Sequence, residues 1–184
     1  DLLSRLAENN AAAVCFSITT LDADLAGKLE PRASRPERRL AAIETLAKSG
    51  IPTGVMVAPV IPGLTDHEMP AILKAAAQAG ARSAGYVLLR LPHGVRNLFE
   101  DWLAHHFPDR KEKVLNRIRD TRGGKLNDAR FGTRMRGQGH YSEHLSRLFT
   151  IARRQAGIEQ RTESLSTAAF RQPFGQMQLF QEPG

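Results

Sequence analysis

The chain has 184 residues, of which 41% are hydrophobic and 24% are charged, with 15 Gly and 10 Pro. This composition is typical of a globular protein and excludes a collagen-like chain, low-complexity disorder and a disulfide-rich scaffold. No apolar run approaches the ~20 residues that a membrane-spanning helix needs, so we expect no membrane association. The first residues show neither an initiator Met nor a signal-peptide pattern, so we expect the chain to begin within a longer protein.

Cys15 is the single cysteine of the chain. One thiol excludes an internal disulfide and any all-Cys metal or iron–sulfur site within these residues. Because Cys15 lies in an apolar run, we expect a small buried side chain. A single unpaired cysteine also favours a reducing, cytoplasmic setting.

The net charge of +7 comes from the second part of the chain. Residues 1–107 carry 11 Lys and Arg against 11 Asp and Glu, whereas residues 108–184 carry 15 against 8. Most of the excess lies between Arg110 and Arg136, which suits either a footprint for phosphate backbones or an ordinary solvated face. The candidate contacts to nucleic acid are Arg117, Arg119, Arg122, Lys125, Arg130, Arg134 and Arg136. Phe131 is the one aromatic residue in this stretch that could stack on a base.

Strands and helices alternate in the first part of the chain. Residues 1–9 indicate the end of a helix, and apolar runs predict strands at 13–20, 53–59 and 83–90. Residues 22–35 predict a polar loop, and the capping-box patterns Ser34–Glu37 and Thr65–Glu68 predict the starts of two helices. These helices end near Gly50 and Gly80.

The second part of the chain is mainly helical. Further helices are predicted at 95–106, 109–119 and 141–155, and the glycine-rich stretch 122–139 predicts a loop. The last 25 or so residues are polar, and we expect them to be extended or poorly ordered.

Three strands that are each followed by a helix predict a parallel sheet covered by helices. Functional loops of such units gather at the carboxyl ends of the strands, here residues 17–20, 59–66 and 90–93. Three strands are too few to close a barrel and leave an unpaired edge. We therefore expect preceding strands, or another chain, to cover that edge.

Several short motifs resemble those of radical S-adenosylmethionine (SAM) proteins, in the same order and at compatible spacing. The resemblance is strongest to the branch similar to spore photoproduct lyase and often labelled DNA repair photolyase-like. It extends over about residues 1–150. The motifs are Phe16-Ser-Ile-Thr-Thr20, Leu29-Glu-Pro31, Arg38-Arg39, Gly50-Ile51, the run Ala58–Asp66, Leu89-Arg-Leu-Pro92, Arg122-Gly-Gly124 and Phe131-Gly132.

The resemblance implies the C-terminal half of a radical SAM partial (β/α)6 barrel, followed by a helical, basic extension. Residues 1–107 would form the last three β/α units, residues 108–156 the extension and residues 157–184 a polar tail. Family members hold a [4Fe–4S] cluster with a Cys-x3-Cys-x2-Cys motif, which this chain lacks. The resemblance therefore implies a parent enzyme that cleaves SAM and abstracts hydrogen from a substrate, with nucleic acid as the leading candidate. The fragment alone is expected to be inactive.

The resemblance also implies residues that bind SAM. Ser17 and Arg38 match positions that hold its carboxylate, and this pairing suits the planar donors of an arginine. Val57 and Val60 would pack against the adenine, and backbone groups of residues 89–91 (Leu89, Arg90 and Leu91) would meet its edge. Glu30 would contact substrate or ribose, or else accept a hydrogen bond from Arg32 or Arg35. His93, near the end of the third strand, is a candidate to line a substrate pocket.

Two alternatives remain open. His140-Tyr-Ser-Glu-His144 fits the inverted zincin pattern, in which His140 and His144 share a zinc ion and Glu143 acts as the base. That reading needs a third ligand downstream, and a pair of surface histidines is the plainer interpretation. The other alternative is a non-catalytic module that binds nucleic acid, or acts as a scaffold, through residues 110–136.

Overall fold

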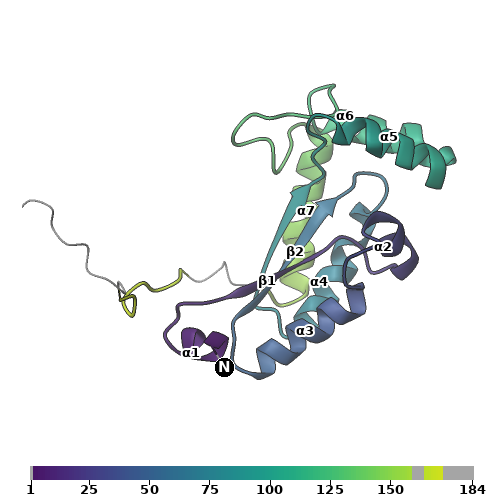
Figure 1. Cartoon of the computed structure of the whole chain (residues 1–184). Coiled ribbons are helices and arrows are strands. Elements are labelled where there is room, and N and C mark those ends of the chain that lie inside the picture. Colours follow the sequence, from purple (N-terminus) through teal and green to yellow (C-terminus); the bar gives the residue numbers. More distant parts are fainter. Residues whose placement is uncertain (1, 159–163, 172–184) are drawn as a thin grey trace, which may run out of the picture.

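The computed structural model describes residues 2–158 and 164–171 and shows a mixed α/β fold (Figure 1). Its strands are β1 (Val14–Ile18), β2 (Thr53–Val60) and β3 (Ser83–Leu88). The helices in chain order are α1 (Leu2–Glu8), α2 (Ala23–Leu29), α3 (Pro36–Lys48), η1 (Asp66–Glu68), α4 (Met69–Gln78), α5 (Val95–His106), η2 (Pro108–Arg110), α6 (Lys111–Asp120) and α7 (His140–Gln155).

The three predicted strands are confirmed and form one parallel sheet in the order β1-β2-β3. In its register Phe16 lies beside Val55 and Val55 beside Ala84, so these three side chains share a face. The ladder between β2 and β3 is irregular between Val57 and Val60, where the Ala58–Pro59 peptide is cis. β1 has no strand on its outer side within the described residues.

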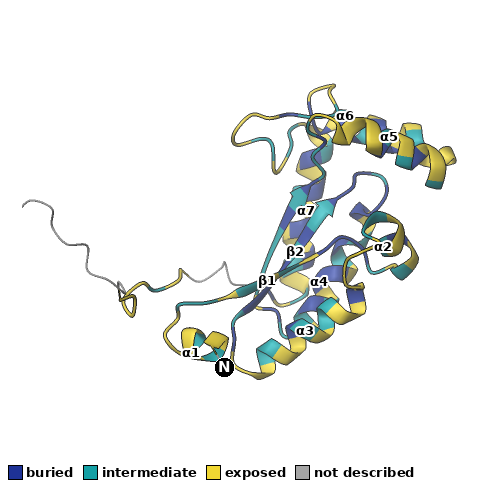
Figure 2. Ribbon diagram, in the orientation of Figure 1, coloured by how far each residue is buried: buried dark blue, intermediate teal, exposed yellow. Residues whose placement is uncertain are grey.

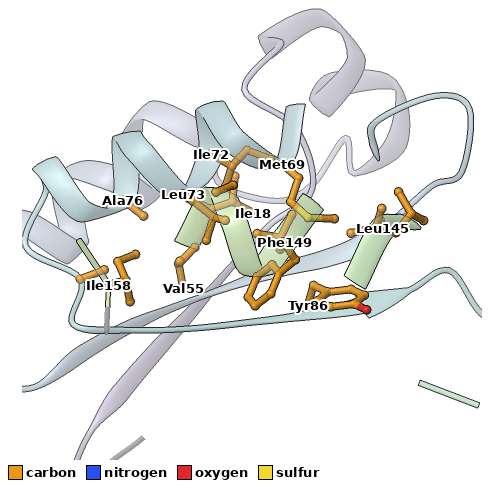
Figure 3. Close-up of a cluster of buried hydrophobic side chains, with 14 of the residues drawn as sticks. Ile18, Val55, Met69, Ile72, Leu73, Ala76, Tyr86, Leu145, Phe149 and Ile158 are labelled. Atoms are coloured by element: carbon orange, nitrogen blue, oxygen red, sulfur yellow. The ribbon is translucent and has the colours of Figure 1, made fainter. Parts of the chain in front are cut away.

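The main core lies on one face of the sheet, beneath α3, α4 and α7 (Figure 3). Large apolar side chains of the strands pack there against the helices, and the Tyr86 and Phe149 ring centroids are 4.8 Å apart. Members of this cluster include Ile18, Val55, Tyr86 and Leu88 from the strands and Ile43, Ile72, Leu73, Leu145 and Phe149 from the helices. Such close packing fixes the helices on this face and orients the sheet.

A second core holds α2, α5 and α6 beyond the carboxyl ends of the strands (Figure 1). It joins Leu25 of α2 to Phe99 and Leu103 of α5 and to Ile118 of α6, with Leu91 from the segment after β3. The predicted helix 95–106 is confirmed, and the helix expected over 109–119 is resolved into η2 and α6. This group builds the surface beside the strand ends, where the candidate site lies.

The polar segment 22–35 is not a plain loop, because it contains α2. Asp22 is the N-cap of that helix, and its carboxylate accepts hydrogen bonds from the N–H groups of Asp24 and Leu25. A capping carboxylate supplies partners that the first turn of a helix lacks. The short, polar helix was missed because it has only one buried residue, Leu25.

Both helices begin close to the predicted positions, but neither pattern forms a capping box. Arg35, not Ser34, is the N-cap of α3, and Pro36 occupies the first turn. The Thr65 hydroxyl accepts from the N–H of Ile61, 3.0 Å away, and Glu68 accepts hydrogen bonds from Thr20 and Leu21, which follow β1, instead of closing a box. Tertiary partners therefore outcompete the local pattern at these positions.

The remaining elements follow the prediction. The stretch 122–139 contains no helix or strand, and α7 matches the helix expected at 141–155. The predicted polar tail lies largely outside the described residues. Across the part of the chain that the structure describes, no helix has both the length and the apolarity to cross a bilayer. The domain boundaries at 107 and 156 stay predictions.

Candidate functional site

No helix covers the second face of the sheet in the described structure (Figures 1 and 2). Because side chains alternate along a strand, the register places one set of residues together on this open face. Its members are Cys15, Ser17, Gly54, Met56, Ser83, Gly85 and Val87. The open face is the part of the sheet that can receive a ligand or another layer of the protein.

Two glycines, Gly54 and Gly85, add no side chain to this face, and neighbouring side chains lie over them. A Cβ atom at Gly85 would lie 2.9 Å from the sulfur of Met56, whose side chain therefore runs across β3. At Gly54 a Cβ would lie 2.3 Å from the Ser83 hydroxyl oxygen. Cys15 and Ser17 are exposed here, so the expectation of a buried Cys15 is wrong. The cysteine lies on the uncovered face rather than in the core.

Arg39 of α3 is the arginine that reaches the end of β1. Its guanidinium donates to the carbonyl oxygens of Ser17 (2.6 Å) and Ser34 (2.9 Å) and to the carboxylate of Glu30 (2.9 Å). An arginine has five N–H donors, so two remain for a ligand. The Arg39 side chain is 16% exposed, and its pairing with Glu30 fixes it in place.

Arg38, which the sequence analysis selected, is exposed on the same helix. No hydrogen bond joins Arg38 to Ser17 in the described residues, and the adjacent Arg39 makes that contact instead. Glu30 accepts its hydrogen bond from Arg39 and not from Arg32 or Arg35. The sequence contained the arginine pair, but a one-residue step along a helix changes direction by about 100° and decides which one faces the strand.

Glu68 completes the end of β1. Its carboxylate accepts from the Thr20 hydroxyl at 2.6 Å and from the Leu21 N–H at 2.8 Å. The Thr20 hydroxyl oxygen in turn accepts from the N–H of Asp22, which begins α2. Sequence reasoning missed this role because Glu68 is 47 residues away from Leu21 in the chain.

The candidate adenine contacts Val57 and Val60 lie in the core, each with 1% of its surface exposed. Beside them, Asp66 accepts from the N–H groups of Gly63 and His67 and from the hydroxyl of Tyr141 on α7. Burial, together with the bond to Asp66, raises the pKa of Tyr141 above its ordinary value. Val57 and Val60 support the fold at this edge, and their assignment to adenine stays a prediction that this placement does not favour.

Arg122 organises the end of β3. Its guanidinium donates to the carbonyl oxygens of Leu88 (3.3 Å), Leu89 (2.8 Å), Thr133 (3.2 Å) and Arg134 (2.8 Å). The N–H of Leu89 donates to the carbonyl of Val60, so both backbone groups of Leu89 already have partners. Leu91 is buried, and Arg90 keeps a buried Nε atom without a partner in the described chain.

The predicted nucleic-acid residues are not equivalent. Arg122 is 2% exposed, so we remove it from that set. Arg130 forms an ion pair with Asp128 at 2.9 Å, and this hydrogen-bonded contact holds the pKa of the Asp128 carboxyl well below its usual range. Three others lie over aromatic rings of the protein: Arg117 over Tyr141, Arg134 over Phe131 and Arg136 over the buried Tyr86. Lys125 is exposed, and Arg119 donates to Asn116.

His93 and two of these residues lie at one pocket beyond β3. It encloses about 640 Å³ and is lined by Leu91, His93, Arg96, Glu100, Arg119, Gly124, Lys125, Leu126 and Asn127. The segment after β3, α5, the end of α6 and the following loop all contribute. The structure thus brings His93, Arg119 and Lys125 together, although the sequence analysis placed them in different candidate sites.

The zinc site suggested by His140 and His144 has no third ligand among the described residues. Among the residues described, no group of three or more His, Cys, Asp or Glu side chains is placed to hold a metal ion. His140 and Glu143 are 3.9 Å apart, and the His140 side chain is fully exposed. A [4Fe–4S] cluster does not fit this chain either, because its one cysteine cannot supply three thiolates.

Comparison with known proteins agrees with the resemblance at the level of the superfamily. Residues 1–76 match the pattern of the Radical SAM superfamily. The chain is also 33% identical over 110 residues to an uncharacterized protein of Mycobacterium bovis and to uncharacterized proteins of two strains of Mycobacterium tuberculosis. The aligned part is 59% of this chain and 32% of each relative, so the chain spans about a third of their length. No solved structure matches.

The superfamily match covers the segment that contains β1, Arg39 and β2. The mixed α/β fold with its parallel sheet is compatible with part of a radical SAM domain. The match gives no substrate and does not assign the photoproduct lyase-like branch.

Proposed function

We propose that this chain is the C-terminal part of a radical SAM enzyme and that the open face of its sheet lies toward SAM. In that superfamily a [4Fe–4S] cluster, held by residues outside this chain, would supply the electron for cleavage of SAM, and the residues of this chain would help to bind and orient SAM. The observation that carries the proposal is the one-sided sheet. In the segment that matches the superfamily, large apolar residues on one face pack under helices, and the other face carries Cys15, Ser17, Gly54 and Met56 with no helix over it in the described structure.

The residues of this chain suit the binding of SAM rather than of the cluster. Ser17 offers a hydroxyl on the open face, and Arg39, which binds the backbone carbonyl of Ser17, keeps two N–H groups without a hydrogen-bond partner among the described residues. Such donors suit the carboxylate of SAM, because arginine binds carboxylates through its planar fork. Glu30 would orient Arg39 through their ion pair. In this proposal the cluster ligands belong to a segment that precedes residue 1, and the 184-residue chain alone is inactive.

Two neighbouring arginines test the carboxylate site. In the longer protein with its cluster reconstituted, we expect Arg39→Ala to weaken SAM binding about tenfold and to lower 5′-deoxyadenosine release. One lost charge-assisted hydrogen bond of roughly 1.5 kcal/mol accounts for that size. Arg38→Ala is the matched comparison, because Arg38 is exposed on the same helix. If Arg38→Ala weakened SAM binding and Arg39→Ala did not, the carboxylate site would belong to Arg38, the residue that the sequence motif indicates.

Steric blocking tests the open face itself. Ser17→Trp should abolish SAM binding, whereas Ser49→Trp, at the exposed end of α3, should leave it within twofold. Thermal unfolding of each variant checks that the fold is retained. Unchanged SAM binding in a folded Ser17→Trp variant would contradict the assignment of this face.

The finer part of the proposal concerns the substrate, for which we favour nucleic acid and a lyase-like reaction. Its support is the excess of basic residues around the carboxyl ends of the strands and in the loop 122–139. A non-catalytic module that binds nucleic acid is the second candidate, favoured by Phe131, which is 90% exposed beside Arg134. Exposed aromatic rings among basic residues are typical of single-strand binding. A steep salt dependence of binding, with no effect of SAM in the longer protein, would favour this second function.

A further inference from the structure

The pocket beyond β3 combines a basic rim with an apolar floor. Arg96, Arg119 and Lys125 contribute positive charge from α5, from the end of α6 and from the following loop, and Glu100 is the one carboxylate in the lining. Leu91, 1% exposed, and the partly buried Leu126 form the apolar part. A cavity of about 640 Å³ is of the size that small-molecule ligands occupy.

The charged groups of the pocket are only partly neutralised by the protein. Arg96 lies 3.7 Å from Glu100 and 3.5 Å from the Asn97 side-chain oxygen, and Arg119 uses one nitrogen on Asn116. The Lys125 backbone N–H donates to the carbonyl of Arg122, but its side-chain ammonium makes no hydrogen bond or ion pair with any described residue. The pocket therefore keeps N–H donors and a net positive charge for an anion.

Asn127 has an unsatisfied acceptor at the border of this pocket. Its side-chain oxygen is buried and has no hydrogen-bond partner among the described residues, and the residue lines this pocket. An unmet buried acceptor costs free energy, which a ligand hydroxyl would recover. A phosphate alone would satisfy the basic rim, but a phosphate attached to a sugar would satisfy Asn127 as well.

We infer that this pocket binds the phosphate and sugar of a nucleotide. Arg96, Arg119 and Lys125 hold the phosphate, the Asn127 oxygen accepts from a sugar hydroxyl, and the partly buried Leu126 contacts the sugar ring. The biological role of this site rests on the proposed function, because the bound nucleotide would be part of the substrate and would lie at the carboxyl end of β3. It needs neither SAM nor a cluster for its test, so its failure is distinguishable from failure of the proposed enzyme.

The test measures binding of defined probes to the 184-residue chain by calorimetry. Thymidine 5′-monophosphate should bind at least tenfold more tightly than thymidine, because only the former carries the phosphate. The double variant Arg96→Gln/Lys125→Gln should weaken this binding at least tenfold. The control Lys113→Gln/Arg154→Gln removes the same charge at exposed positions outside the pocket and should change it less than twofold.

Two further arms sharpen the result. Glu100→Gln should strengthen binding about two- to fivefold, because it removes repulsion of the phosphate and the partner of Arg96. A gain of affinity cannot arise from misfolding. An eight-residue oligothymidine that binds more than tenfold tighter than the monophosphate would identify a nucleic-acid chain as the source, and equal binding would identify a free nucleotide.

Three results would overturn the inference. They are the absence of binding of thymidine 5′-monophosphate, equal binding of thymidine, and equal losses in the pocket and control double variants. The last result would mean that general charge attraction, rather than this pocket, holds the probe.

Discussion

At Arg122 a positive charge is buried among backbone carbonyl groups. Four carbonyl oxygens, from the end of β3 and from the loop 122–139, accept its hydrogen bonds, and burial lowers the pKa of the guanidinium. Arginine suits this position because its planar fork can donate to several acceptors at once. The side chain joins β3 to the loop that borders the pocket beyond β3.

Removal of this guanidinium should destabilise the whole chain. We expect Arg122→Met, which keeps the apolar stem, to lower the free energy of unfolding by about 3 kcal/mol, because it leaves several buried carbonyls without donors. Urea denaturation followed by circular dichroism gives this value. Arg147→Met on the exposed side of α7 is the control and should stay within about 0.5 kcal/mol of the parent. Equal stability of both variants would show that the Arg122 bonds contribute nothing net.

The roles of individual residues were harder to predict from the sequence than the helices and strands. Arg122 was grouped with solvent-facing phosphate contacts, since a charge in a glycine-rich stretch gives no sign of the carbonyls that the fold brings to it. Arg38 and Arg39 are indistinguishable as a motif, and only the phase of α3 separates them. Cys15 was expected to be buried because its neighbours are apolar, but its face of the sheet is uncovered.

The two faces of the sheet differ in what their side chains do. On the covered face large apolar groups pack against three helices, and on the open face small groups leave space. The sequence does not predict which face of the sheet is covered, because each strand is a continuous apolar run without polar alternation. The strands themselves were predictable for the same reason, since β-branched runs of this length favour strands.

A matched pair of valines tests this asymmetry. Val55 is 0% exposed beneath the helices, whereas Val87 is only partly buried on the open face. Val55→Ala should cost about 2 kcal/mol of unfolding free energy, since it removes buried methyl groups and leaves a cavity. Val87→Ala should cost less than about 1 kcal/mol. Equal losses in chemical denaturation would mean that both faces are packed in the isolated chain.

Helix ends were predictable only where local chemistry decides them. Pro36 in the first turn of α3 and Gly50 after its end follow the expected asymmetry, and Gly50 has the positive φ of +76° that favours glycine there. Thr65 and Glu68 matched a local capping pattern, but both side chains bond to more distant parts of the chain. Long-range partners of this kind leave no periodic signal.

In the molecule as a whole, the basic residues and the exposed apolar residues lie on different parts of the surface. Basic residues gather around the pocket and the loop at the carboxyl end of the strands. The N-terminal part of the chain carries exposed leucines on α1, among them Leu2 and Leu6. It also contains β1, whose outer side has no partner strand within the described residues. The first surface suits an anionic substrate, and the second suits the preceding segment that we propose.

Cys15 reports on that segment because it lies on the open face of the edge strand β1. In the 184-residue chain we expect the exposed thiol to react with dithiobis(nitrobenzoate) without denaturant. Its rate near pH 7.5 should be lower than in the unfolded chain and should rise with pH, because partial burial raises the pKa of the thiol and reduces the thiolate fraction. Cys15→Ser is the blank for this measurement.

In the longer protein the same thiol should be protected at least tenfold, since the preceding strands would pair with β1 and the ligands of the cluster half would cover the open face. Peptide mapping after brief alkylation of both proteins isolates the Cys15 signal from the other cysteines that a cluster needs. Equal labelling of Cys15 in the two proteins would contradict a shared barrel. It would mean that the preceding segment folds apart from this sheet and that SAM cannot lie between them.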